Sequence, residues 1–248
     1  MKKTLLMAAL AAAVVGGALG CGGKDAKDKP ATAVDTAAVA ADTVAAVPDT
    51  ATTFTDTRDG KVYRRVKIGT QFWMAENLNY AVKGRCYGEG SDVIVGWTKN
   101  DGYITKTLSN AEVQDNCTKY GRLYNWETAL TACPAGTHLP SDDEWTALVD
   151  YVGGEEKAGT KFKSSTGWGP SGRVPTGTDE YGFSALSGGG AYGDGLFDDA
   201  GNFGDWWSAT EVDTDDASFM RMGYDGENVS WSNGDKTLQL SVRCVADD

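Results

Sequence analysis

The sequence is short of proline, histidine, basic residues and long apolar runs. It has 6 prolines and 1 histidine in 248 residues, and 23 Lys and Arg against 35 Asp and Glu, for a formal net charge of −12. This charge repels phosphate backbones, which argues against nucleic acid as a partner. The apolar run over residues 5–15 has eleven residues, whereas a helix needs ~20 to cross a bilayer. Any membrane attachment must therefore be covalent.

The first residues have the pattern of an export signal. Lys2 and Lys3 precede the apolar run, and small residues follow it. Ala18-Leu19-Gly20-Cys21 resembles the bacterial lipobox. This predicts a signal peptide over residues 1–20 and acylation of Cys21, with palmitate-type chains holding the protein at the membrane. By analogy with other lipoproteins, Gly22 favours the outer membrane and a surface-exposed domain. The alternative is an ordinary secretory peptide that leaves Cys21 as a thiol.

The number of cysteines agrees with a lipid anchor. Of the five cysteines, one is Cys21 and four lie further along the chain. Exported proteins usually pair their thiols, and four thiols allow three pairings. We therefore expect two disulfides among Cys86, Cys117, Cys133 and Cys244.

Residues 21–53 read as a tether. Residues 22–53 contain no aromatic residue, and Ala, Thr, Val, Asp and Lys dominate. Asp-Thr recurs every seven residues at Asp35, Asp42 and Asp49. A coiled coil would need large apolar residues in each heptad, but here these positions are mostly Ala. The pattern favours a low-complexity linker.

The folded domain is expected over residues 54–248, which contain all eight Trp and all ten Tyr. Residues 61–68 and 71–74 flank Gly69-Thr70 and predict a β-hairpin. The late runs 217–224 and 237–245 predict strands.

Two helices are expected between these strands. One covers residues 124–131, with Trp126 on its apolar face. The other follows Ser141, whose spacing from Glu144 is that of a capping box. With the Gly-rich stretches after residue 154, the composition predicts an α+β domain with two helices, short strands and long loops.

A series of motifs in the domain resembles the Fibrobacter succinogenes major paralogous domain. The motifs run in order from Phe54 to Val245. They begin with Phe54-Thr55-Asp56-Thr57-Arg58-Asp59-Gly60-Lys61-Val62-Tyr63 and include Val66-Lys67-Ile68-Gly69, Trp73-Met74-Ala75-Glu76-Asn77-Leu78-Asn79, Tyr120-Gly121-Arg122-Leu123-Tyr124, Cys133-Pro134, His138-Leu139-Pro140-Ser141, Ala158-Gly159-Thr160-Lys161, Gly182-Phe183-Ser184-Ala185-Leu186, Trp207-Ser208-Ala209-Thr210 and Val242-Arg243-Cys244-Val245. The resemblance implies a cell-surface protein, and the family has no established activity.

Two of these motifs are also similar to formylglycine-generating enzymes. Residues 138–145 resemble their helix start and residues 242–245 their chain ending. This implies a C-type-lectin-like fold. The oxidase chemistry of those enzymes uses two cysteines near the C-terminus, whereas only Cys244 lies there.

The resemblance also favours one disulfide pairing. C-type-lectin-like domains commonly join their helical part to the end of the chain, which here pairs Cys133 with Cys244. Cys86 and Cys117 would then close the insertion between them, which is rich in Gly, Asp and Asn.

Aromatic residues on loops are the candidate ligand contacts, because aromatic rings stack on sugars. Trp168, Trp206 and Trp231 lie among Gly, Ser and Asp, although each would equally suit the core, and Trp207 is expected in the core. His138 precedes a helix cap and is interpreted as a hydrogen-bonded packing residue.

No cofactor is predicted, and calcium is the alternative. The candidate oxygen ligands form two clusters, Asp213, Asp215 and Asp216, and Asp194, Asp198, Asp199 and Asn202. Neither cluster matches an EF-hand loop, and the sugar motif of calcium-dependent lectins is absent.

No catalytic constellation emerges from these residues. The first hypothesis is therefore a non-enzymatic surface lipoprotein that binds a polysaccharide or a surface protein. The alternatives are a structural envelope component and an enzyme of unrecognised mechanism.

Overall fold

The computed structural model describes residues 52–99, 102–169, 177–193 and 195–247. The predicted signal peptide, Cys21 and almost all of the predicted tether lie outside these ranges. Four helices are described: α1 (Asn110–Tyr120), α2 (Trp126–Ala132), α3 (Asp142–Tyr151) and α4 (Glu155–Phe162). The strands are β1 (Thr52–Thr55), β2 (Val62–Ile68), β3 (Gln71–Met74), β4 (Val93–Trp97), β5 (Tyr103–Lys106), β6 (Leu123–Tyr124), β7 (Thr137–His138), β8 (Gly188–Ala191), β9 (Phe197–Ala200), β10 (Phe203–Glu211), β11 (Asp216–Gly223), β12 (Val229–Asp235), β13 (Leu240–Ser241) and β14 (Val245–Ala246).

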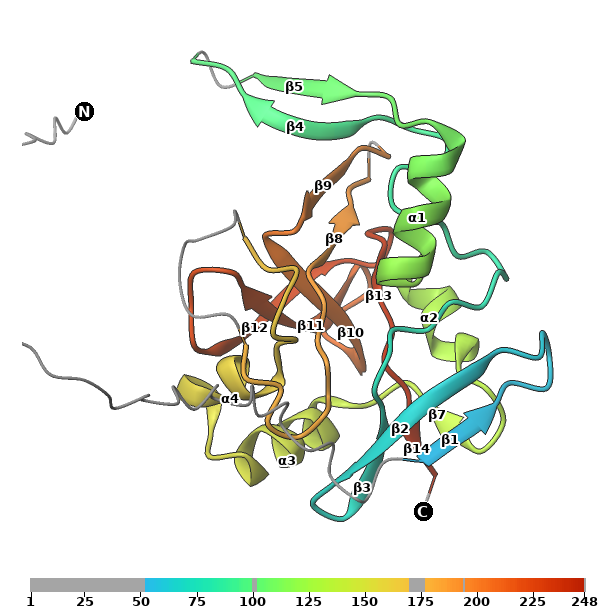
Figure 1. Ribbon diagram of the computed structural model, residues 1–248, viewed down its shortest axis with the longest axis vertical. Helices are drawn as coiled ribbons and strands as arrows, with labels where there is room; N and C mark the ends of the chain where they lie inside the picture. The colour runs from blue at the N-terminus through green and yellow to red at the C-terminus, as the bar shows by residue number, and fades with distance from the viewer. Residues whose placement is uncertain (1–51, 100–101, 170–176, 194, 248) are drawn as a thin grey trace, which may run out of the picture. The chain divides into compact units, whose positions relative to one another are not determined.

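The strands form two sheets. The five-stranded sheet has the order β1-β2-β3-β14-β7. The nine-stranded sheet has the order β12-β11-β10-β8-β9-β4-β5, with β13 joining β10 to β6. Figure 1 shows β10, β11 and β12 in the centre of the domain and the β4–β5 hairpin at one end. The β5 strand is therefore an edge of the larger sheet.

The predicted hairpin is confirmed, because β2 and β3 pair in antiparallel register from Arg65↔Met74 to Ile68↔Gln71. Strand β11 confirms the first late run. The second late run is not one strand but two. Its residues 242–244 pass from the larger sheet to the smaller one, and the carbonyls of Val242 and Cys244 accept hydrogen bonds from Leu78 and Met74 on the way.

The prediction of two helices is wrong, since the described ranges contain four. Helix α3 has the expected capping box, with the Ser141 side chain accepting from the Glu144 N–H. Helix α2 begins at Trp126, two residues later than predicted, because Asn125 is its N-cap. Helix α1 has the same capping box, from Ser109 to Glu112, so its start could have been recognised. Helix α4 follows Gly154, which offers no side-chain cap.

The main core lies between the two sheets and helices α3 and α4. Trp73, Trp145 and Phe183 are completely buried there, and the Trp73 and Trp145 ring centroids are 4.7 Å apart. Buried aromatic rings of this size contribute a large part of the hydrophobic stabilisation. This explains why the tryptophans gather in the folded part of the chain.

Two disulfides tie the loops to this core. Cys86 pairs with Cys117 and Cys133 pairs with Cys244, with Cα–Cα distances of 4.8 and 5.8 Å. Both pairs are the expected ones. In the chain-entropy model their loops of 31 and 111 residues correspond to about 4 and about 5 kcal/mol.

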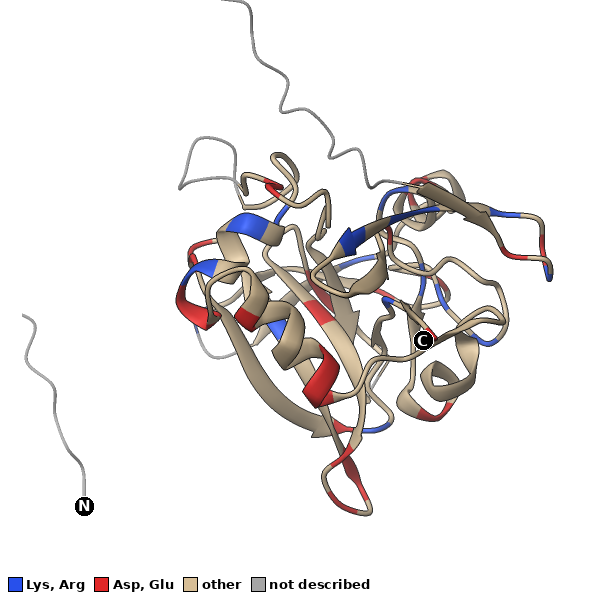
Figure 2. Ribbon diagram, turned by 90° about the horizontal axis from the view of Figure 1, so that it is seen from below, with Lys and Arg blue, Asp and Glu red and all other residues tan. Residues whose placement is uncertain are grey.

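Charged residues of both signs are mixed on the surface. Figure 2 shows Lys and Arg in blue interspersed with Asp and Glu in red. Most ion pairs have exposed partners and contribute little. Asp56–Arg58 and Asp205–Arg221 differ, because the two aspartate side chains are 0 % and 4 % exposed.

Candidate functional site

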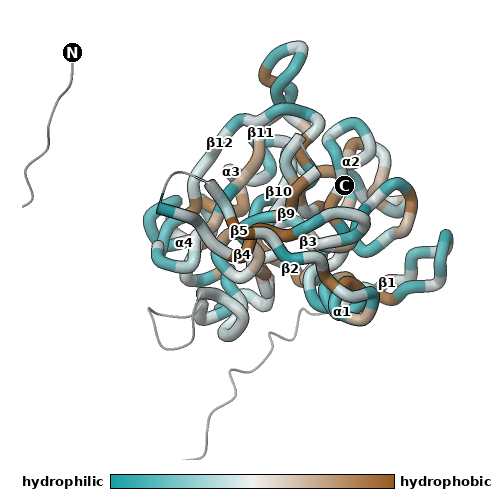
Figure 3. The backbone as a smooth tube through the Cα atoms, turned by 90° about the horizontal axis from the view of Figure 1, so that it is seen from above, coloured by the Kyte–Doolittle hydropathy of each residue, from teal (hydrophilic) through white to brown (hydrophobic). Residues whose placement is uncertain are grey.

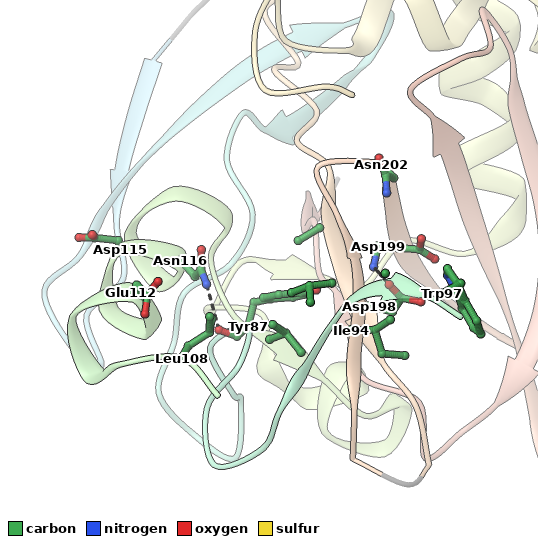
Figure 4. Close-up of a pocket in the computed structure, with 14 residues that line it drawn as sticks. Tyr87, Ile94, Trp97, Leu108, Glu112, Asp115, Asn116, Asp198, Asp199 and Asn202 are labelled. Carbon is green, nitrogen blue, oxygen red and sulfur yellow. Dashed lines mark hydrogen bonds between the residues drawn. The ribbon is translucent and has the colours of Figure 1, made fainter. Parts of the chain in front are cut away.

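A groove with a volume of about 590 Å³ lies beside the β4–β5 hairpin. Its lining comes from β4, α1 and the segment from β9 to Asn202. Figure 4 shows Leu108, Glu112, Asp115 and Asn116 at one end and Trp97, Asp198, Asp199 and Asn202 at the other. Tyr87, Val93 and Ala200 add apolar surface between the two ends. The volume lies in the range of small-molecule sites.

The hairpin carries an unusual number of exposed apolar side chains. Of the ten large hydrophobic residues that are exposed in the described ranges, four are on it, namely Val95, Trp97, Tyr103 and Ile104. Trp97 is 66 % exposed, and its ring meets Tyr103 edge-on at 6.1 Å. In Figure 3 the brown stretches of β4 and β5 lie on the outside of the domain. Exposed apolar surface of this kind marks an interaction site.

The wall formed by α1 is fixed in place. The Cys86–Cys117 disulfide joins the helix to the segment that carries Tyr87, and the Asn116 side chain donates to the Tyr87 carbonyl at 3.2 Å. Lys106 of β5 pairs with Glu112 at 2.7 Å. Lys106 and the Ser109 cap lower the pKa of Glu112 to about 2. The groove is therefore already formed in the free protein.

Strand β9 supplies the acidic end of the groove, with Asp198 and Asp199. Asp199 has a φ of +69°, a left-handed conformation that is uncommon outside glycine. Its N–H donates to the Asp198 carboxylate at 2.7 Å, and its own carboxylate accepts from the Tyr192 hydroxyl at 3.4 Å. Burial and the charge of Asp198 raise the pKa of Asp199. Such backbone strain concentrates at functional sites.

An ion pair between β10 and β11 lies close enough to affect Asp199, since Arg221 lowers and Asp205 raises the pKa of the Asp199 carboxyl. Arg221 of β11 makes two parallel hydrogen bonds to Asp205 of β10, at 2.7 and 2.8 Å. Burial raises the pKa of the Asp205 carboxyl, and the guanidinium opposes this rise. The Arg221 guanidinium also lies over the Phe203 and Phe219 rings. Since Asp205 already neutralises it, Arg221 is not a spare cation for a ligand.

The motif residues noted in the sequence meet elsewhere, in a buried hydrogen-bond network around Asn77. The Asn77 carbonyl oxygen accepts from Trp206 and Arg243, both at 2.9 Å, and its amide donates to the Tyr120 carbonyl at 2.9 Å. The Arg243 guanidinium is fully buried and donates to the carbonyls of residues 74, 183 and 184. Burial lowers the pKa of Arg243 to about 9. These residues build the scaffold.

The comparison with protein families agrees with this common scaffold. The model of the Fibrobacter succinogenes major domain matches residues 66–246. The chain belongs to this family. No curated protein and no solved structure matches the chain.

The predicted ligand residues of this Fibrobacter succinogenes major domain do not form one site. Trp206 is 0 % exposed and Trp168 is 6 % exposed, so neither can stack on a ligand at the surface. The indole of Trp168 donates to the Ala185 carbonyl at 3.0 Å, and the core requires both rings. Trp231 is half-buried, and its indole donates to Glu155 at 3.0 Å. It lies on β12, at the opposite end of the nine-stranded sheet from the β4–β5 hairpin. Trp207 is in the core, as expected.

His138 is held by two carboxylates. Its Nδ1 lies 2.7 Å from Asp247 and its Nε2 lies 2.7 Å from Glu144. Burial alone lowers the pKa of His138, but the two hydrogen bonds outweigh it and place the pKa above the ordinary 6.5. This agrees with the interpretation of His138 as a hydrogen-bonded structural residue.

Within the described residues, carboxylates of both acidic clusters accept hydrogen bonds from backbone N–H groups. Asp213 caps the β10–β11 turn by accepting from the N–H groups of Asp215 and Asp216. Of the second cluster, Asp194 lies outside the described residues. Within the described ranges, no group of three or more His, Cys, Asp or Glu residues is arranged to hold a metal ion.

Sequence reasoning missed the aromatic face of the groove. Trp97 and Tyr103 lie in the insertion between Cys86 and Cys117, which was described from the sequence only as rich in Gly, Asp and Asn. The β-branched run Val93-Ile94-Val95, followed by Trp97, and the pair Tyr103-Ile104 could have indicated two strands of a hairpin. Within the described ranges, no helix has the length and apolarity that a membrane crossing needs.

Proposed function

We propose that this domain is a non-catalytic binding module for an extracellular polysaccharide and that the groove beside the β4–β5 hairpin is its ligand site. The observation that supports the proposal most strongly is the position of Trp97, which is 66 % exposed at the rim of a preformed groove. Contact between an indole ring and water is unfavourable, and exposed apolar surface of this kind marks sites that a ligand covers. The carboxylate and amide groups beside it can accept and donate hydrogen bonds to sugar hydroxyls.

The Trp97→Ala substitution tests this site. Loss of a central aromatic contact typically lowers affinity at least about tenfold. The purified protein would be titrated against a panel of extracted surface polysaccharides by calorimetry. Tyr151→Ala is the matched control, because Tyr151 is 60 % exposed on α3 and does not line the groove. Equal binding by both variants, or turnover of the ligand, would refute the proposal.

A protein ligand is the second candidate, favoured by the exposed edge of β5. The strand has four exposed residues and lies at the end of the sheet, where an extended peptide could add a strand. Protease treatment of the ligand fraction separates the two candidates. Binding that survives digestion supports the polysaccharide, and binding that disappears supports the protein.

We also propose that the fold is C-type-lectin-like. The Cys133–Cys244 disulfide supports this, because it joins the end of α2 to the chain's last segment. The pairing of β14 with β3 supports it as well, since it brings the end of the chain next to the domain's first hairpin. An experimental structure of the protein would test the assignment by superposition on lectin-like domains.

The proposed anchor is a lipid on Cys21, which would hold the binding module at the outer membrane. It rests on the lipobox-like sequence and on the pairing of all four other cysteines. Mass spectrometry of the N-terminal peptide of the mature protein should find a diacylated and N-acylated Cys21. An unmodified thiol there would exclude the anchor.

A further inference from the structure

The charged residues that line the groove indicate which class of polysaccharide it can bind. The lining contains the carboxylates of Glu112, Asp115, Asp198 and Asp199, and no Lys or Arg among the described residues. Glu112 is already paired with Lys106. In the part of the chain that the structure describes, Asp115, Asp198 and Asp199 form no ion pair. Three residues that line the groove thus carry a carboxylate without an ion-pair partner.

The cations nearest to the groove have other partners. Arg221 is held by Asp205 through two hydrogen bonds. Arg85 lies over the Phe197 ring, 4.8 Å from its centroid, and donates to the Glu89 carbonyl. An acidic polysaccharide would therefore meet unpaired carboxylates and no cation to compensate its own charge. A ligand with positive charges would reduce the repulsion between Asp198 and Asp199.

We propose that the groove binds a polymer of amino sugars with free, protonated amino groups. This deepens the proposed polysaccharide binding and rests on it. Trp97 offers exposed apolar surface to the sugar rings, and the carboxylates at the two ends of the groove offer acceptors to the ammonium groups (Figure 4). The charge complementarity distinguishes this ligand from neutral and acidic polysaccharides of the same length.

The test compares two ligands that differ only in acetylation. The full-length protein in detergent is titrated by calorimetry at pH 6 with a hexamer of β-1,4-linked glucosamine and with its N-acetylated form. The free-amine hexamer should bind at least about tenfold more tightly at 20 mM NaCl. The difference should shrink at 200 mM NaCl, because salt screens exposed charges.

Two substitutions test whether these carboxylates cause the difference in affinity between the two hexamers. Asp115→Asn and Asp198→Asn should each weaken binding of the free-amine hexamer by about two- to fivefold and weaken binding of the N-acetylated hexamer less. Asp150→Asn is the matched control, since Asp150 is an exposed acid on α3 outside the groove. It should bind both hexamers like the unmodified protein.

The outcomes separate this inference from the proposed function. Equal affinity for the two hexamers would overturn the amino-sugar inference and leave polysaccharide binding standing. Failure of every polysaccharide in the panel to bind would overturn both. A lysine-rich peptide that competes as strongly as the free-amine hexamer would show that the groove recognises amines on a polypeptide, which also overturns the inference.

Discussion

Asn77 offers the sharpest test of how the scaffold is held together. Asn77→Leu keeps the size of the side chain but removes the acceptor of two buried donors, the Trp206 indole and the Arg243 guanidinium, both at 2.9 Å. A buried donor without a partner costs ~1–3 kcal/mol, and a charged donor costs more. The Tyr120 carbonyl also loses its amide donor. We expect the free energy of unfolding to fall by about 4–6 kcal/mol.

The matched control is Asn79→Leu, two positions along the chain. The Asn79 amide donates one hydrogen bond, to the Cys117 carbonyl at 3.0 Å, so its loss should cost only about 1 kcal/mol. Urea denaturation followed by tryptophan fluorescence measures both variants against the unmodified protein. A domain of this size has a total stability of ~5–15 kcal/mol, so Asn77→Leu should shift the midpoint far more. If the two substitutions cost the same, the network around Asn77 is not what holds the buried guanidinium.

Two further predictions concern ion pairs. Arg221→Met should lower the stability by about 3–5 kcal/mol in urea denaturation, because it leaves the buried Asp205 carboxylate without its partner. A loss below 1 kcal/mol would mean that Asp205 is neutral in the folded protein. The pKa of His138 is raised in the folded state by Asp247 and Glu144 against the effect of burial, so its stabilising contribution is complete below pH 6.5 and disappears as the pH rises through the folded-state pKa. Accordingly, His138→Gln should destabilise the protein at pH 5.5 more than at pH 8.5, and an equal loss at the two pH values would contradict this assignment.

The sequence predicted the parts of the fold that depend on local chemistry. The β2–β3 hairpin followed from alternation around Gly69-Thr70, and α3 followed from the Ser141 capping box. Helix α4 was missed because Gly154 provides no cap and Gly159 lies within the helix. Gly159 is present for a tertiary reason, since a Cβ there would lie 2.3 Å from the Asn228 carbonyl oxygen.

The site was harder to predict than the fold, because burial depends on contacts between distant segments. Trp206 follows the charged residue Asp205 and Trp97 follows the apolar run Val93-Ile94-Val95, but Trp206 is fully buried and Trp97 is exposed. The difference arises from the partner of the indole. Trp206 reaches Asn77, which lies 129 residues away, and no local pattern reports such a contact.

The Cys86–Cys117 disulfide has a consequence for how binding preference could change. It holds the Cα atoms of Cys86 and Cys117 4.8 Å apart. The segment between them, residues 87–116, includes β4, β5 and most of α1. Because the closure entropy of a loop grows slowly with its length, a segment of another length and composition could occupy the same two endpoints. The residues of the Asn77 network all lie outside this segment. The segment between the two cysteines can therefore be exchanged for another. Grafting a different segment there should change which ligand the domain binds while the core continues to fold.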